Sequence, residues 1–202
     1  NFIFNCLIMG MSLSSELKKL YVGSKEVKEA YIGSSKIYPI QTEVDPTNYV
    51  IVLPLGGELS LSYIGSSPDY YIEYSILTDP SNLTWNPLSY GDVATTADNT
   101  PILLRGNLIP VANRGIGTIR IQGECFLGGN CMALLYGDDA YNKTTMPYDY
   151  AFYRLFINCT NIKGIDYGFL PATTLSTQCY AYMFKGCTGL LESPLLPATN
   201  LV

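Results

Sequence analysis

Four carboxylates lie where acid–base or metal chemistry would be sought: Asp138, Asp139, Asp149 and Asp166. Paired carboxylates can act as acid and base, and carboxylate oxygens are the ligands that calcium prefers. Their spacing does not match the calcium loop of an EF-hand. We therefore expect solvated loop acids, and we assign no catalytic, cofactor-binding or metal-binding residue.

Cysteines offer a second kind of chemistry, at Cys6, Cys125, Cys131, Cys159, Cys179 and Cys187. No pair has the Cys-x-x-Cys spacing that zinc and redox sites use. The chain contains no histidine, which excludes Ser-His-Asp and Cys-His catalysis, histidine metal ligands and a histidine pH switch. A disulfide framework remains open for a secreted chain, but we expect buried thiols.

Tyrosine is unusually frequent, at 17 of 202 residues, so an aromatic contact surface is a third option. We expect about half of the candidates to belong to the core instead. They are Tyr70, Tyr71, Tyr74, Tyr148, Tyr150, Tyr153, Tyr180 and Tyr182. The single tryptophan, Trp85, is expected to fill the core of the β-sandwich predicted below for residues 45–124, with ligand stacking as the alternative.

Composition favours binding or structure over catalysis. Only 14% of the residues are charged, and 12 Lys and Arg against 17 Asp and Glu give a net charge of −5. A nucleic-acid-binding protein would carry a basic patch, so we expect no nucleic-acid partner. The longest apolar stretch, from Phe2 to Met11, is too short to cross a bilayer, so no membrane insertion is expected. We predict that the protein is not an enzyme and uses no cofactor.

The elements that would position these residues fall into three segments. Residues 1–44 are interpreted as an N-terminal arm followed by a β-meander that serves anchoring or oligomerisation. Within it, Tyr21-Val22-Gly23-Ser24 recurs as Tyr31-Ile32-Gly33-Ser34, and apolar residues alternate around each Gly-Ser. This pattern predicts short strands joined by tight turns, which cannot bury a core alone.

Residues 45–124 are predicted to form a β-sandwich that is immunoglobulin-like in the loose sense. Short strand candidates alternate with turn residues such as Asp79-Pro80-Ser81-Asn82, and no helical stripe is evident. The candidates are Tyr49–Leu53, Glu58–Tyr63, Tyr70–Leu77, Ile102–Gly106 and Thr118–Gln122.

Residues 125–202 contain an internal repeat that predicts the start of a leucine-rich-repeat solenoid. Phe156–Ile162 matches Phe184–Leu190 at an offset of 28, and Leu170–Leu175 matches Leu196–Leu201 at an offset of 26. Stacking would align Phe156 with Phe184 in a continuous core. Because solenoids generally need three or more coils, we expect further repeats in the native protein.

Two resemblances to known families follow from these motifs. The doubled Tyr-x-Gly-Ser segment resembles a module common in tail and fibre proteins of tailed bacteriophages. Met183-Phe184-x-Gly186-Cys187-Thr188-x-Leu190 and Leu196-Pro197-Ala198-Thr199-x-Leu201 resemble BspA-type leucine-rich repeats. Such repeats occur in bacterial surface adhesins and in virion proteins of phages of gut anaerobes. The first repeat departs from the pattern, with Asn158 where the second has Gly186.

The resemblances imply a virion structural protein, a tail or head fibre. Its N-terminal part would anchor it to the capsid or tail, and its repeat region would bind a host-surface receptor or glycan. A homo-oligomer is expected, with a trimer as one option. The alternative is a BspA-like adhesin on the bacterial cell surface. A glycan-cleaving tailspike enzyme would need a carboxylate pair that the repeats do not show.

Overall fold

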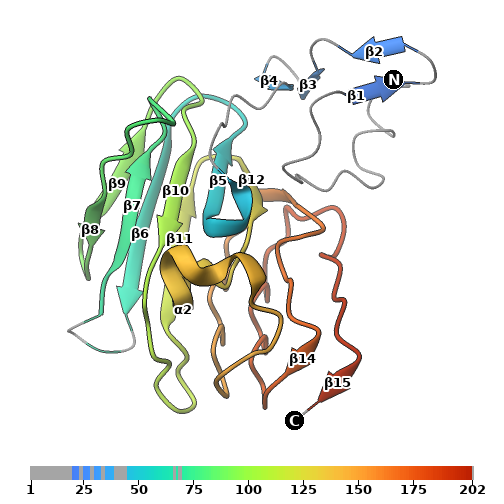
Figure 1. The fold of residues 1–202 in the computed structure, drawn as a ribbon. Helices are drawn as coiled ribbons and strands as arrows, with labels where there is room; N and C mark the ends of the chain where they lie inside the picture. Colours follow the sequence, from blue (N-terminus) through green and yellow to red (C-terminus); the bar gives the residue numbers. More distant parts are fainter. Residues whose placement is uncertain are drawn as a thin grey trace.

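The structure of the protein is a computed structural model that describes residues 20–22, 25–27, 30–32, 35–38, 45–65, 67 and 70–201. The fold is mainly β, as predicted, and two larger sheets form its body. Coils of chain lie beside these sheets and lead to the C-terminus (Figure 1).

The N-terminal segment contains two hairpins rather than the single meander expected from the sequence. Strands β1 (Leu20–Val22) and β2 (Lys25–Val27) pair with each other, and β3 (Ala30–Ile32) pairs with β4 (Ser35–Tyr38). Among the residues that the structure describes, the two pairs are separate two-stranded sheets. The arm expected over Phe2–Met11 lies outside the described residues.

A six-stranded sheet has the order β13-β12-β5-β10-β7-β8. All of its pairs are antiparallel except β12 with β13, which is parallel. The strands, in chain order, are β5 (Val50–Pro54), β7 (Ile72–Ile76), β8 (Asn86–Leu88), β10 (Ile102–Arg105), β12 (Cys125–Gly129) and β13 (Ile162–Ile165). A short 3-10 helix, η1 (Pro46–Asn48), precedes β5 and begins at Asp45, whose side chain accepts from the Thr47 amide.

A three-stranded sheet has the order β11-β6-β9 and comprises β6 (Leu59–Gly65), β9 (Val93–Thr96) and β11 (Gly117–Gln122). Buried residues alternate along β6 at Leu59, Leu61 and Tyr63, and along β11 at Ile119 and Ile121. This period of two places one face of the sheet on the core. The five strands predicted between residues 49 and 122 are therefore confirmed, within a few residues at their ends.

Four strands of the two larger sheets were not predicted from the sequence, and one of them is β13, which pairs in parallel with β12. Strand β8 contains Pro87 and lies at a sheet edge, where a missing backbone donor is tolerated. Strand β9 is short and lies at the edge of the other sheet. The sequence places the residues of β12 at the start of the repeat region, whereas the strand hydrogen-bonds along the whole of β5.

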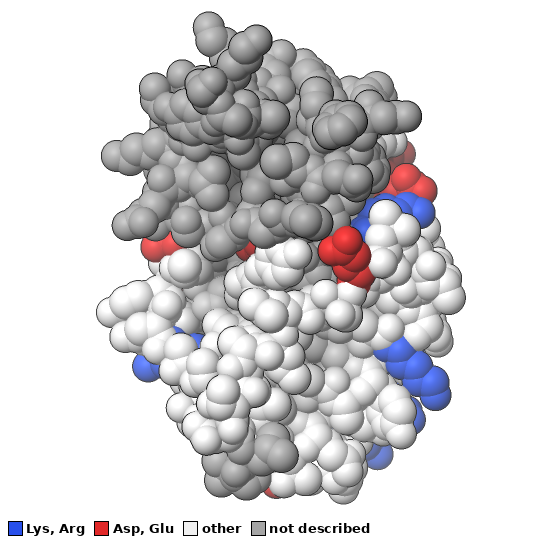
Figure 2. All heavy atoms as spheres, turned by 90° about the vertical axis from the view of Figure 1, so that its right-hand side faces the viewer, with Lys and Arg blue, Asp and Glu red and all other residues white. Residues whose placement is uncertain are grey.

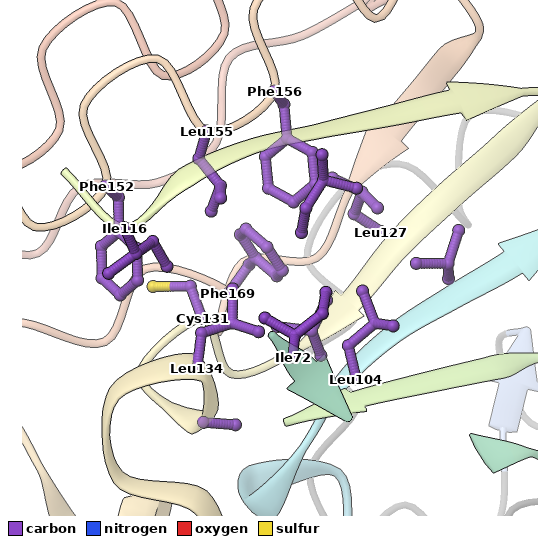
Figure 3. Packing of buried hydrophobic residues seen from close by; sticks show 14 of the residues in the cluster. Ile72, Leu104, Ile116, Leu127, Cys131, Leu134, Phe152, Leu155, Phe156 and Phe169 are labelled. Carbon is purple, nitrogen blue, oxygen red and sulfur yellow. The ribbon is translucent and has the colours of Figure 1, made fainter. Parts of the chain in front are cut away.

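One hydrophobic core joins the body of the protein. It runs from Val50 in β5 to Cys187 in the second repeat, so residues 45–124 and 125–202 both contribute to it. Phe152 and Phe156 of the first repeat point into the same interior as Ile72 of β7 and Leu127 of β12 (Figure 3).

Trp85 does not fill this main core, so that prediction is wrong. Side chains alternate along a strand, and therefore Ile51 and Leu103 face the opposite side of the six-stranded sheet from Val50 and Leu104. The partly exposed Trp85 packs on that outer side, in a smaller cluster with Ile51, Leu77 and Leu103.

A short helical segment connects the sheets to the repeats. It consists of α2 (Ala133–Tyr136) and the 3-10 helix η2 (Gly137–Asn142). Buried Asn130 fixes it, because its Nδ2 donates to the carbonyls of Thr47 and Ala140 at 2.8 and 3.1 Å. Its Oδ1 accepts from the Met132 amide at 2.9 Å. None of the described helices is both long and apolar enough to span a membrane.

The repeats form two adjacent coils, which we define as the first coil (residues 148–175) and the second coil (residues 176–201). The rings of Phe156 and Phe184 stack, which confirms the predicted offset of 28. Strand β14 (Thr174–Leu175) pairs in parallel with β15 (Asn200–Leu201), residue for residue at the predicted offset of 26. Between the ring stack and the strand pair, the first coil is therefore two residues longer than the second.

A run of turns forms one side of each coil. Every fourth residue there has a positive φ, and the same positions recur 28 residues later. These residues are Tyr150, Arg154 and Asn158 in the first coil and Gln178, Tyr182 and Gly186 in the second. Tyrosine, arginine and glutamine seldom adopt the left-handed conformation, so tertiary contacts hold it here.

The first coil rests on the outer edge of β11. The amides of Ile116 and Ile119 donate to the carbonyls of Ala151 and Leu155 at 3.1 and 2.7 Å. Arg120 Nη1 adds a bond to the Ile157 carbonyl at 3.0 Å. Strand β11 thus bonds β6 on one side and the first coil on the other.

Candidate functional site

A cluster of tyrosines and basic residues lies across the turn runs of the two coils. The rings of Tyr150 and Tyr153 meet edge to face at 5.8 Å between centroids. Tyr153 meets Tyr182 of the next coil in the same way at 5.7 Å. Three aromatic rings from two coils thereby form one continuous cluster, which we call the tyrosine surface together with Arg154 and Lys185.

Two cations complete the tyrosine surface. The guanidinium of Arg154 lies 4.9 Å from the ring centre of Tyr153 and 5.7 Å from that of Tyr182. The Lys185 amine lies 5.2 Å from the Tyr182 ring. Cations over ring faces are attracted by the negative face of the π-system, so the cluster is held by cation–π contacts.

The sequence pattern positions this surface through the repeat. Arg154 and Tyr182 occupy equivalent positions 28 residues apart, and both have the positive φ of the turn run. Their side chains are exposed, with 52% of Tyr182 accessible to solvent. Rigid aromatic rings that expose hydroxyl groups next to cations are suited to contacts with glycans or protein surfaces.

The eight candidate tyrosines are divided by the structure rather than gathered on one face. Tyr70, Tyr74 and Tyr180 pack against the main core, so part of the expectation of core tyrosines is confirmed. Tyr71 lines a separate pocket and is 49% exposed, and Tyr148 is 37% exposed. Arg154 and Lys185 were missed from the sequence, although Arg154 follows Tyr153 directly and aligns with Tyr182 in the repeat.

The pocket has a volume of about 580 Å³ and lies beside Arg105, with Tyr71, Glu73, Asn107 and Asp138 among its lining residues. Arg105 donates to Glu73 at 2.7 Å and to both oxygens of Asp138 at 2.9 Å. Two carboxylates therefore already neutralise this cation.

The Arg105 guanidinium also lies 4.0 Å from the centre of the Trp85 ring, and Trp85 is 5.3 Å from Tyr49. The planar guanidinium can stack on an aromatic face and bind carboxylates in its plane at the same time. Arg105 thus connects the outer cluster of the six-stranded sheet with η2. Its bonds to Glu73 and Asp138 link three of the residues that line the pocket.

The predicted loop acids lie in different settings. Asp138 pairs with Arg105, and Asp149 Oδ1 accepts from the Thr177 amide at 3.0 Å. Asp166 is buried, contrary to the expectation of a solvated acid, and its own amide donates to the Leu127 carbonyl. In the part of the chain that the structure describes, no three potential metal ligands lie together.

Five of the six cysteines are described, and all five are buried free thiols, as expected. Two of them occupy equivalent repeat positions and bond backward to the preceding layer. Cys159 Sγ donates to the Ile119 carbonyl at 3.2 Å, and Cys187 Sγ donates to the Phe156 carbonyl at 3.0 Å. Burial raises the pKa of Cys159 to about 11 and that of Cys125 to about 12, so these thiols are unreactive at neutral pH.

A scan of protein-family models and searches of curated proteins and solved structures gave no match to this chain.

Proposed function

We propose that the protein is a virion structural protein, a tail or head fibre of a tailed bacteriophage. Its N-terminal part would anchor it to other virion proteins, and its repeat region would bind the host surface. The doubled hairpins support this proposal, since β1–β2 and β3–β4 have the tandem arrangement of the phage-fibre module that the sequence resembles. A protein with no enzymatic activity fits this role.

The finer fold is part of the proposal. The two sheets would form an immunoglobulin-like sandwich that acts as a spacer, and the coils would begin a leucine-rich-repeat solenoid. Offsets of 28 and 26 between ring stacks and strand rungs support the solenoid. The packing of both sheets around one core supports the sandwich.

The tyrosine surface is the observation that carries the binding role. It spans both coils, combines three rings with two cations, and contains the half-exposed Tyr182. Truncating an aromatic anchor at the centre of an interface commonly removes much of its binding energy. A receptor or glycan on the host surface is the ligand class that this composition suits.

Binding to intact cells from a panel of gut anaerobes tests the proposal. In the Tyr182→Ser variant, we expect retention of labelled protein on the cells to fall about tenfold or more. The matched control is Tyr90→Ser, because Tyr90 is 70% exposed and lies away from the coils. Equal binding by both variants would remove the tyrosine surface from the proposal.

The virion location has its own test. Peptides from residues 45–201 should be found by mass spectrometry in purified phage particles. A variant lacking residues 1–38 should remain folded but should no longer be incorporated into particles. Detection in an outer-membrane fraction and not in particles would favour the BspA-like adhesin instead.

A further inference from the structure

Three exposed cations come from three successive layers of the protein, and we call them the basic strip. They are Arg120 in β11, Arg154 in the first coil and Lys185 in the second coil. Ile119 and Ile121 of β11 are buried, so the side chain of Arg120 points to the opposite, outer side of the strand.

Contacts across the layers bring these cations together. Arg120 Nη1 donates to the Ile157 carbonyl of the first coil at 3.0 Å. Ile157 is the repeat equivalent of Lys185, so Arg120 and Lys185 lie in the layers on either side of it. Arg154 and Lys185 in turn share the ring of Tyr182, at 5.7 and 5.2 Å from its centre. The three positive charges are therefore neighbours, and two of them belong to the tyrosine surface.

The positive charge of the strip is not balanced by the protein. None of the three cations forms an ion pair with a carboxylate among the described residues. By contrast, two carboxylates bind Arg105, and Lys163 lies 2.9 Å from Glu124. Neighbouring like charges repel each other, so an anion bound to the strip would remove an unfavourable interaction.

The segments that carry the strip contain no acidic residue. Strand β11 and the turn runs, residues 150–158 and 178–186, lack Asp and Glu, although acids outnumber bases in the chain by 17 to 12. The preceding acid, Asp149, accepts from the Thr177 amide. Figure 2 views the molecule from the right of Figure 1, where the coils lie. Acidic atoms lie mainly in the upper part of its described surface, whereas Lys and Arg atoms follow the lower right edge.

A polymer with repeated anions fits the strip better than a single anion does. A guanidinium binds a carboxylate or phosphate through two parallel hydrogen bonds, and an ammonium binds it as a point charge. An exposed ion pair is worth about 0–1 kcal/mol, so one anion alone would be held weakly. A polymer would engage several cations at once, because the first contact raises the effective concentration of the next anion.

Nucleic acid is the other polyanion to consider, and two features disfavour it. Arg154 and Lys185 already lie against the Tyr182 ring, so a base would have to displace them in order to stack there. The net charge of −5 opposes the approach of a densely charged strand. A sugar can instead hydrogen-bond to the phenolic hydroxyl of the half-exposed Tyr182 while the cations stay in place.

We propose that the basic strip and the tyrosine surface bind an anionic glycan, a sugar polymer whose repeating units carry carboxylate or phosphate groups. The anions would pair with Arg120, Arg154 and Lys185, and the sugar hydroxyls would contact the tyrosines. This inference rests on the proposed function, because it names the class of ligand that the same surface binds on the host.

Binding of the 202-residue protein to two pairs of polymers tests the proposal. Polygalacturonate carries carboxylates, and its methyl ester is the neutral counterpart. Phosphomannan carries phosphates, and dephosphorylated mannan is the neutral counterpart. At least one anionic polymer should bind about tenfold or more tightly than its neutral counterpart, and its affinity should fall as NaCl is raised from about 0.02 M to about 0.2 M. The tighter of the two anionic polymers identifies the anionic group.

Variants that remove charge assign the binding to the strip. The double variant Arg154→Gln and Lys185→Gln should bind the anionic polymer at least about fivefold more weakly. Glutamine suits position 154, because Gln178 adopts the same positive φ in the other turn run. The matched control is Lys143→Gln, since the Lys143 amine also lies 5.2 Å from a tyrosine ring, that of Tyr136, but belongs to the end of η2. Circular dichroism checks that each variant is folded.

A single variant in the sheet keeps the test independent of the coils. Arg120→Gln removes one charge of the strip from β11 and should also weaken binding of the anionic polymer, whereas the neutral polymers should not distinguish it from the parent. Unchanged affinity in both Arg120→Gln and the double variant would overturn the proposal.

Further outcomes would also overturn it. One is equal binding of the anionic and neutral polymers, or binding of none of them. Another is tighter binding of a single-stranded DNA of equal charge, which would assign the strip to nucleic acid. The host-binding proposal is judged separately on cells. If the double variant binds cells as well as the parent does, this inference fails and host binding stands. Binding to polymers without binding to cells gives the reverse result.

Discussion

The ring of Phe156 stacks on that of Phe184 at 5.7 Å with an interplanar angle of 4°, so the two coils meet ring on ring at equivalent repeat positions. Phe156 is fully buried, whereas Phe184 is partly buried. The contact thus joins the main core to the second coil.

Removing the buried ring should be costly. Phe156→Ala should lower the free energy of unfolding by about 3–5 kcal/mol, since it leaves a cavity in a close-packed core. Phe184→Ala should cost less, because its ring is partly exposed. Urea unfolding of both single variants and the double variant should give a coupling of about 0.5–1.5 kcal/mol. A double variant of Phe152 and Phe184 serves as the control, because Phe152 stacks on Tyr180 and not on Phe184. Its loss in the free energy of unfolding should be closer to the sum of the two single losses.

Close approach of the coils predicts a strong effect at Gly189. A Cβ at Gly189 would clash with the Thr160 carbonyl oxygen, and a main-chain atom cannot move aside as a side chain can. Gly189→Ala should therefore lower the free energy of unfolding by about 1–3 kcal/mol. Gly56→Ala is the matched control, because no heavy atom lies within 4 Å of its Cβ position. Equal urea midpoints for the two variants would contradict the packing described here.

Thiol reactivity should report the integrity of the core. In a Cys6→Ser variant, the five remaining cysteines are all buried, so a thiol reagent should modify none of them rapidly in the native protein. All five should react once the protein is unfolded in urea. Rapid modification of Cys159 or Cys187 in native buffer would show that the coils open easily.

Alkaline pH should destabilise the fold. The ordinary pKa of a thiol is near 9, whereas that of Cys159 is raised to about 11 and that of Cys125 to about 12 by burial. Between these values the unfolded chain loses protons that the folded chain retains, so the free energy of unfolding falls as pH rises from about 9 towards 12. Each thiol contributes a slope of up to about 1.4 kcal/mol per pH unit. Urea unfolding at several pH values should show a shallower slope in Cys159→Ala than in the parent.

Arg105 should resist replacement even by lysine. Arg105→Lys keeps the charge, but a single amine cannot replace the Nε bond to Glu73, the Nη1 bonds to Asp138 and the planar stacking on Trp85 at the same time. We therefore expect the free energy of unfolding to fall by about 1 kcal/mol. Emission from the single tryptophan should also change, since the guanidinium lies 4.0 Å from its ring. Arg114→Lys, on an exposed turn, should leave both stability and emission unaltered.

The sequence repeat was sufficient to predict register between the coils. Recurrence of Phe at 156 and 184 and of Leu at 175 and 201 placed the ring stack and the β14–β15 rungs correctly. Such patterns can be read because equivalent residues occupy equivalent environments in stacked repeats. The candidate surface was predicted only as a set of tyrosines, without Arg154 and Lys185, because which side of a coil faces solvent depends on its backbone path.

Other features depended on long-range contacts that no local pattern reveals. Tyr150 and Arg154 have no residue-type preference for a positive φ, and their amides donate to the Thr177 and Ala181 carbonyls of the second coil. Strand β12 has a sequence that fits several settings, and its place beside β5 follows from pairing across more than seventy residues. The size of Trp85 predicts a place in the main core. Apolar side chains of β5 and β10 point to both faces of the six-stranded sheet, however, and Trp85 covers the outer face.

Strand β11 gives the chain an order of assembly. One edge of β11 is hydrogen-bonded to β6. Along the other edge, main-chain amides donate to carbonyls of the first coil. Strand β11 precedes both coils in the sequence, so it leaves the ribosome before the coils that pack against the sheets. Folding during synthesis can therefore proceed from the sheets outward, each layer giving the next its register and leaving the most recently made coil as the last to become ordered.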